Sequence, residues 1–151
     1  MKRDTAGENL EATWQSCLRA TKWLERSYQH SPRPPFLSLT DAEWDQLEAL
    51  SGRFARVTDL IIHKLLRAID RCELEETGTL LDAANRATKR GLIASPGVLR
   101  EFKDIRNEIV HEYTIEDLAG LYADIHAATT DLLLLVSSIE TYLRDKQLIN
   151  Q

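Results

Sequence analysis

Apolar residues recur every three or four positions along nearly the whole chain, which is the spacing that one face of an α-helix produces. A two-residue alternation is not sustained anywhere, and the chain has no Asn-Gly or Asp-Gly hairpin signal. The pattern therefore predicts an all-α protein, an antiparallel bundle of about five helices joined by short connections.

Two helices account for the first half of the chain. The first, over about residues 8–29, ends at the proline-rich segment 31–35, because proline cannot donate to the helix ladder. The second begins at the capping-box pair Thr40 and Glu43 and continues to about Cys72. The apolar stripe of the first helix comprises Leu10, Trp14, Cys17, Leu18, Thr21, Leu24 and Tyr28. The stripe of the second comprises Leu47, Leu50, Phe54, Val57, Ile61, Leu65, Ile69 and Cys72.

Three shorter patterns predict the remaining helices. A third helix covers roughly residues 79–90 and ends at Gly91, a typical C-terminal cap. Ser95 and Pro96 then offer an N-cap and a first helical residue for a fourth helix that runs to about His111. Thr114 caps a fifth helix with an unbroken seam. That seam comprises Leu118, Leu121, Ile125, Ala128, Leu132, Leu135, Ile139 and Tyr142.

Length and composition fit one domain over residues 1–151, with an N-terminal helix at 8–30 and a core at 41–148. Apolar residues make up 43% and charged residues 28%, as in ordinary soluble proteins. The N-terminus lacks the apolar core of a secretory signal, and no apolar run has the length of a membrane span. Cys17 and Cys72 show no disulfide-framework spacing, so we expect a reduced, cytoplasmic protein.

Charge is unevenly distributed along the chain. The net charge is −5, which alone argues against nucleic-acid binding. Residues 85–106, however, hold six basic residues against two acidic ones. A solvated face explains such a run, but its position just before residues 106–113 favours a surface that faces phosphate. The candidate RNA-binding residues are Arg86, Lys89, Arg90, Arg100 and Lys103.

Residues 106–113 (RNEIVHEY) carry the candidate chemistry. Arg106 is a permanent cation with a fork of donors that suits a phosphate. His111 exchanges protons near neutral pH. On an ideal helix Arg106 lies about 40° from Phe102, at the centre of the apolar stripe. It therefore either extends along its stem to solvent or faces a groove or partner that supplies an anion.

The same helical geometry separates the two groups. Arg106 and His111 lie about 140° apart on an ideal helix, so they do not converge on one phosphate within one straight helix. Asn107 and His111 lie one turn apart on one face and can meet. A two-fold dimer that brings two such helix ends together would place both sets of groups around one cleft.

These residues resemble the HEPN superfamily of small all-helical proteins, and above all its HepT-like branch, whose signature is Arg, four residues, His, one residue and Tyr. Here the signature is Arg106, His111 and Tyr113, and Asn107 directly after the Arg also fits. The turn at residues 91–93 and the apolar helix that leads into the motif fit as well. The resemblance covers roughly residues 41–143.

The resemblance implies a homodimeric, metal-independent endoribonuclease, the toxin of a toxin–antitoxin pair, with its motif at a cleft between subunits. The antitoxin would be a nucleotidyltransferase of the MNT type that transfers AMP to the motif tyrosine. By this resemblance Arg106 and His111 are the catalytic pair, Asn107 supports them, and Tyr113 is the modified residue. No cofactor or metal is expected, and the partners are RNA, the antitoxin and a second copy of the chain.

Two other functions stay open. Related HEPN proteins serve as non-catalytic partners or substrate-binding subunits of nucleotidyltransferases, and a structural bundle with an incidental Arg and His is the third reading. Elsewhere, the sequence predicts a partly buried His63 and a surface position for His126. No His, Cys, Asp or Glu spacing indicates a metal site. The three tryptophans, Trp14, Trp23 and Trp44, are expected to be packing residues.

Overall fold

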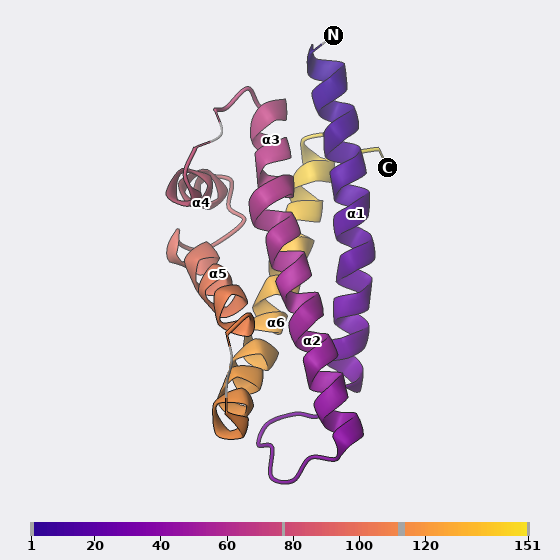
Figure 1. The fold of residues 1–151 in the computed structure, drawn as a ribbon. Coiled ribbons are helices and arrows are strands. Elements are labelled where there is room, and N and C mark those ends of the chain that lie inside the picture. Colours follow the sequence, from indigo (N-terminus) through magenta and orange to yellow (C-terminus); the bar gives the residue numbers. More distant parts are fainter. Residues whose placement is uncertain (1, 77, 112–113, 151) are drawn as a thin grey trace.

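The computed structural model describes residues 2–76, 78–111 and 114–150, and within them the chain is all-α, as predicted (Figure 1). The elements are α1 (Lys2–His30), α2 (Asp41–Leu60), a π-helical turn η1 (Ile61–Leu65), α3 (Leu66–Cys72), α4 (Leu80–Lys89), α5 (Gly97–Ile109) and α6 (Ile115–Asp145).

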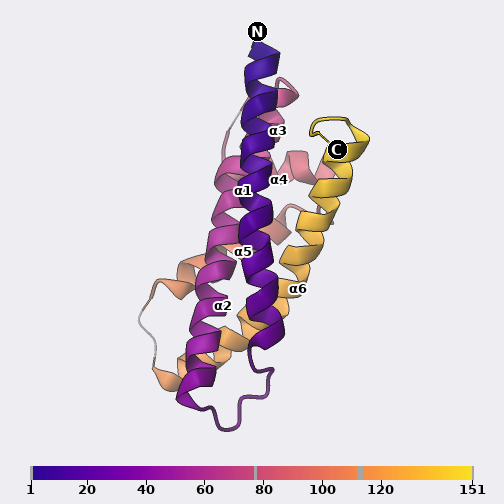
Figure 2. The same cartoon turned by 90° about the vertical axis from the view of Figure 1, so that its right-hand side faces the viewer.

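Four long segments run up and down along one another. α1 descends, the continuous α2–η1–α3 helix returns, α5 descends part of the way and α6 returns, which leaves both termini at one end of the bundle (Figure 1). α4 lies across the side of this bundle near the end of α3. Figure 2 shows α1 running alongside both α2 and α6. The predicted antiparallel bundle is confirmed for the single chain.

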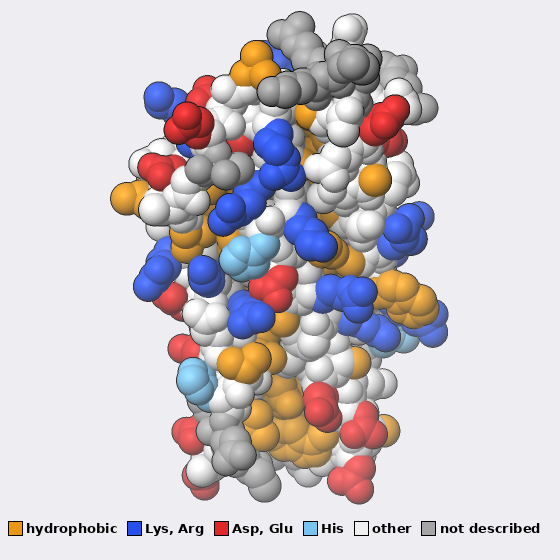
Figure 3. All heavy atoms as spheres, turned by 45° about the horizontal axis from the view of Figure 1, so that its top comes forward, with side chains coloured by type: hydrophobic (Ala, Val, Ile, Leu, Met, Phe, Trp, Pro, Cys, Tyr) orange, Lys and Arg blue, Asp and Glu red, His pale blue; other side chains and the backbone are white. Residues whose placement is uncertain are grey.

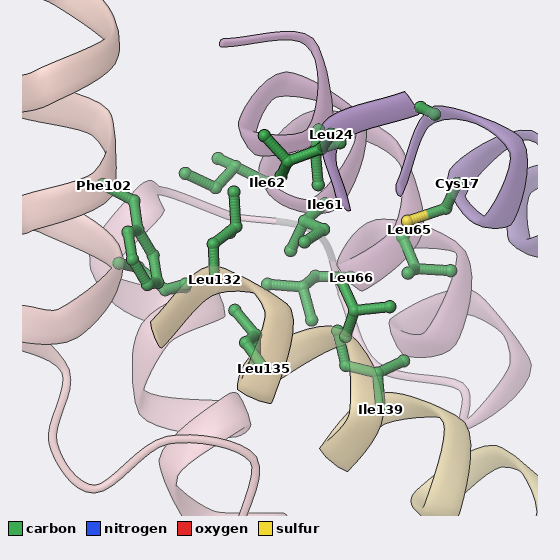
Figure 4. Close-up of a cluster of buried hydrophobic side chains, with 14 of the residues drawn as sticks. Cys17, Leu24, Ile61, Ile62, Leu65, Leu66, Phe102, Leu132, Leu135 and Ile139 are labelled. Carbon is green, nitrogen blue, oxygen red and sulfur yellow. The ribbon is translucent and has the colours of Figure 1, made fainter. Parts of the chain in front are cut away.

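The apolar stripes of the helices meet in one core (Figure 4). Side chains from α1, η1, α3, α5 and α6 interdigitate there, and Cys17, Leu24 and Ile139 are fully buried. Phe54 of α2 and Phe102 of α5 make an edge-on contact with ring centroids 6.3 Å apart. The predicted stripes of the first and second helices are largely confirmed, because their members are buried or packed against this core.

Local hydrogen bonds start α2, α4 and α6 and stop α4 where the sequence predicts, whereas α1 begins at Lys2 rather than at about Glu8. Thr40 and Thr114 each complete a capping box, with the side chain accepting from the backbone of Glu43 and of Asp117 respectively. Thr79 forms a third such box at the start of α4. Gly91 takes the left-handed conformation, with φ of 78°, that a helix C-terminus favours in glycine. Each cap contributes about 1 kcal/mol.

Both ends of the fourth helix differ from the prediction. Pro96 is the residue before α5 rather than its first residue, and Ser95 contributes its backbone carbonyl, which accepts from Val98 at 3.2 Å. At the other end α5 stops at Ile109 rather than at His111. The backbone there tightens, because Val110 and His111 donate to carbonyls only three residues back, at 3.3 and 3.1 Å.

The π turn η1 interrupts the second helix in its middle. The N–H of Leu66 reaches back five residues to the carbonyl of Ile61, so one extra residue is accommodated in that turn. The turn buries Ile61, Ile62 and Leu65. It leaves His63 and Lys64 exposed, so the prediction of a partly buried His63 is wrong.

α6 is the seam helix of the bundle. Ile125, Leu132 and Ile139 are buried along it, as the predicted seam requires. Within the described part of the chain it is the one helix whose length and apolar content would also allow a membrane span, a property that core helices share. The half-buried ring of His126 stacks on Tyr28 with centroids 4.7 Å apart.

Candidate active site and the basic face around it

Arg106 lies on α5 and is held by a carboxylate from α2. Its Nε lies 3.0 Å from Oδ1 of Asp59, and both Nε and Nη2 donate to Oδ2 at 3.2 Å. The two side chains are 35% and 37% exposed. The anion that the wheel position required is thus supplied by this chain, 47 residues earlier, where no local sequence pattern indicates it.

Of the other motif residues, Asn107 contacts this ion pair. Nη1 of Arg106 donates to Oδ1 of the exposed Asn107 at 3.4 Å, a long bond that places the two side chains together. His111 is exposed and follows the end of α5, so the ideal-helix angle between Arg106 and His111 no longer applies. Tyr113, the predicted modification target, lies outside the described residues.

A groove of about 500 Å³ opens beside the ion pair. Besides Arg106 and Asp59, its charged or titratable lining consists of Arg56, His63 and Lys64, which come from α2 and η1. A guanidinium, an imidazole and an ammonium group therefore line one groove with Arg106, and Asp59 is the acidic side chain among the lining residues that the structure describes. This arrangement suits an anionic ligand.

The groove belongs to a larger basic face that the sequence analysis missed. Basic side chains gather on one face of the molecule, over the long second helix and the helices beside it (Figure 3). We call this surface the basic face; on the second helix it comprises Arg53, Arg56, Lys64, Arg67 and Arg71. The spacing of these basic residues places them away from the apolar stripe of the same helix. This spacing could have indicated the basic face from the sequence.

Two of the predicted RNA-binding residues are engaged in a buried network. Arg86 and Arg90 bind the two carboxylate oxygens of Asp70 at 3.0 and 2.8 Å, and Asp70 is 1% exposed. Arg90 also pairs with Glu73 at 3.3 Å. Burial lowers the pKa of Arg90, but the bond to Asp70 and the charge of Glu73 raise it by more, and the net shift is upward. These arginines fasten α4 to α3.

The other three predicted residues lie closer to solvent. Arg100 pairs with Asp104 one turn later at 3.3 Å, on the exposed side of α5. Lys89 is exposed near the end of α4. Lys103 lines a small cavity together with Arg67 and His63, so it borders the basic face directly.

Within the described residues, no group of three His, Cys, Asp or Glu side chains is arranged to hold a metal ion. Comparison with protein-family models, with curated proteins and with solved structures found no match to this chain. The resemblance to the HEPN superfamily therefore depends on the motif itself and on its place at the end of a helix in an all-α bundle.

Proposed function

We propose that this chain is a metal-independent endoribonuclease, the toxin of a toxin–antitoxin pair that acts in the cytoplasm. The observation that carries the proposal is the placement of the motif. Arg106 lines a groove with three further basic or titratable side chains on a basic face, in a protein whose net charge is −5. An RNA phosphate is the ligand for which such a concentration of positive charge beside a histidine is suited.

The residues present supply the groups that RNA cleavage requires. The ribose 2′-oxygen attacks the adjacent phosphorus while the bond from phosphorus to the 5′-oxygen breaks, which leaves a 2′,3′-cyclic phosphate and a 5′-hydroxyl. His111 accepts the proton of the attacking hydroxyl or gives one to the leaving oxygen. Arg106 stabilises the negative charge that builds up on the phosphorane oxygens.

The ion pair with Asp59 determines the orientation of the Arg106 guanidinium. Asp59 engages Nε and Nη2, so it fixes the plane of the guanidinium and leaves other hydrogens of Nη1 and Nη2 for a phosphate. Asp59 is therefore a positioning residue in this proposal. A substrate phosphate adds to the remaining donors or competes with the carboxylate for the guanidinium.

The proposed regulation follows from the resemblance and from charge. A nucleotidyltransferase antitoxin of the MNT type would transfer AMP to Tyr113. The added phosphate would carry a negative charge into the place where substrate phosphate binds, and its bulk would block access. The proposed homodimer, with the motif at a cleft between subunits, likewise rests on the resemblance.

The test is cleavage of total RNA in EDTA by purified wild-type protein, His111→Ala and Arg106→Ala. We expect cleavage with cyclic phosphate ends for the wild type only, with unchanged helical circular dichroism in both variants. Tyr113→Phe should cleave RNA and escape AMP transfer. Full activity of His111→Ala or Arg106→Ala would refute the assigned roles.

A second function is favoured by one observation. Because Asp59 already neutralises much of the charge of Arg106, the pair also suits a structural link between α2 and α5 in a non-catalytic partner of a nucleotidyltransferase. Absence of cleavage by protein whose mass shows no added AMP would favour this function. Binding of a nucleotide without cleavage would identify it.

A further inference from the structure

A second groove runs between α1 and α2, on the far side of α2 from α5. Its volume is about 660 Å³, within the range of ligand-binding clefts. Four basic side chains line it, Arg19 of α1 with Arg53, Arg56 and Lys64 of the second helix, together with Trp23. None of the lining side chains that the structure describes is acidic, although acidic residues outnumber basic ones in the chain by 24 to 19.

The cations of this groove are largely uncompensated. Arg56 and Lys64 have no carboxylate within ion-pair distance among the described residues, and the contact of Arg19 is a hydrogen bond to Ser16 at 3.3 Å. Arg53 is the anchored member, because it donates to the hydroxyl of Ser27 on α1. Lys and Arg side chains that neutralise phosphates release the cations condensed on a nucleic acid, and this release favours binding. A cluster of cations without neighbouring acids is suited to such a ligand.

Trp23 distinguishes this groove from a general anion-binding surface. The sequence predicted a packing residue, but the indole is 52% exposed, which corrects that prediction. The guanidinium groups of Arg53 and Arg26 lie 5.1 and 5.6 Å from its ring centroid. An exposed indole among guanidinium groups offers planar surfaces on which an unpaired base can stack. In a duplex the bases are paired inside the helix, so they are not available to stack on this indole.

The two grooves are continuous across α2. Arg56, Leu60 and Lys64 line both the α1–α2 groove and the groove beside Arg106. An extended chain bound along α1 therefore reaches the motif by crossing side chains that it already contacts. Figure 3 shows Lys and Arg side chains gathered across this face.

We propose that the α1–α2 groove binds single-stranded RNA, with Arg19, Arg56 and Lys64 on phosphates and Trp23 stacked on a base. The choice of RNA and the direction toward Arg106 rest on the proposed ribonuclease function. The groove would hold the substrate strand outside the catalytic pair and so set how long an RNA must be for efficient cleavage.

The test is binding of a fluorescein-labelled, single-stranded 2′-O-methyl RNA of about twelve nucleotides, followed by anisotropy at several salt concentrations. This RNA has no free 2′-hydroxyl, so wild-type protein binds it without cleaving it. Arg19→Gln, at a position that lines this groove and not the groove beside Arg106, is compared with Lys22→Gln, which removes the same charge from an exposed lysine of α1 outside the groove. We expect Arg19→Gln to bind at least about threefold more weakly than wild type, and the salt slope of log K to fall by about 0.7, the value for one lost phosphate contact.

Trp23→Leu tests the stacking separately. We expect binding about fivefold or more weaker, as the loss of one base–aromatic stack predicts, with the salt slope unchanged because no phosphate contact is removed. Equal affinity of Trp23→Leu and wild type, or equal losses in Arg19→Gln and Lys22→Gln, would overturn the proposal. Equally tight groove-dependent binding of duplex RNA or poly-glutamate would also overturn it, in favour of a general polyanion surface.

Cleavage assays separate this inference from the proposed function. If the groove variants bind normally while His111-dependent cleavage occurs, the groove proposal fails and the ribonuclease proposal stands. If wild-type protein binds RNA through the groove but cleaves no RNA, the ribonuclease proposal fails and the groove proposal stands. Cleavage of a dinucleotide, which is too short to span both grooves, should be unaffected by Arg19→Gln, whereas cleavage of long RNA should slow.

Discussion

Asp70 offers the sharpest test of the energetics of this fold. It is a carboxylate at 1% exposure between two guanidinium groups, those of Arg86 and Arg90, whose side chains are 20% and 8% exposed. Asp70→Asn keeps the size and shape of the side chain but removes the charge. The amide oxygen still accepts from one arginine, while the amide NH₂ faces the other cation, which loses its acceptor on this side chain.

The expected cost follows from burial. Removing one partner of a buried ion pair costs about 3–5 kcal/mol, because the remaining charge stays desolvated and uncompensated. Arg86 is partly exposed and Arg90 keeps its second pair with Glu73, and both features reduce the loss of stability. We therefore expect a loss at the lower end of this range, about 3 kcal/mol. For a domain of this size that loss lowers Tm by about 6–12 °C.

The matched control is Asp59→Asn, the same substitution at the other carboxylate that binds an arginine. Asp59 and Arg106 are both more than a third exposed, so solvent screens their attraction and the cost is about 1 kcal/mol at most. Urea unfolding followed by circular dichroism gives both values, and unchanged m-values would show that compactness is preserved.

A double variant identifies the cause. The cost of Asp70→Asn is expected to come from the buried charge of Arg90, which Asp70 no longer compensates. Adding Arg90→Met, which keeps the aliphatic volume, should then recover part of the lost stability. A loss below about 1 kcal/mol for Asp70→Asn, equal losses at Asp59 and Asp70, or strict additivity with Arg90→Met would each refute the reasoning.

Three further predictions concern single positions. Gly91→Ala should cost about 1–2 kcal/mol in urea unfolding, because φ of 78° is strained for alanine, and Gly91→Asn should cost less; equal stability of all three proteins would contradict the assigned cap. Burial raises the pKa of Cys17 to about 11, so a thiol reagent at pH 8 should modify Cys72 in the native protein and Cys17 only after unfolding; equal rates would show an accessible Cys17. Burial and the charge of Arg33 lower the pKa of His126 below 6.5, so the unfolded chain binds a proton more readily and stability falls as pH falls through about 6.5; His126→Leu should lose less stability than wild type between pH 7.5 and 5.5.

The features that could be predicted from the sequence depend on contacts within a few residues. The capping boxes at Thr40 and Thr114 join residues three apart, and the cap at Gly91 depends on one backbone conformation. Apolar periodicity likewise reports which face of each helix is buried, and it located the core correctly. Helix ends without such a local signal were predicted less accurately. For example, α5 ends at Ile109 rather than at His111.

The candidate site depends on pairs that are distant in sequence. The wheel position of Arg106 predicted that an anion must meet it, but its partner Asp59 is 47 residues away and has no distinguishing neighbours. Arg86 and Arg90 read as part of a basic run, and only the packing of α4 on α3 reveals their use of Asp70. Trp23 was expected to pack because tryptophan is usually buried, yet it lies outside the apolar stripe of its helix and is exposed.

The π turn at Ile61–Leu65 sets the rotational phase between the two halves of the longest helix. On an uninterrupted α-helix, positions 59 and 70 lie about 20° apart, so both carboxylates would point in nearly one direction. One extra residue in the turn rotates everything after it by about 100°, which lets Asp59 face α5 while Asp70 faces α4. Deleting a single residue there would let the turn close as ordinary α-helix with the same rotation between its two sides, so both ion-pair networks would be kept. In the chain as it stands, the extra residue must stay outside the regular α-helical ladder, because an uninterrupted α-helix of the same length would turn Asp70 away from Arg86 and Arg90.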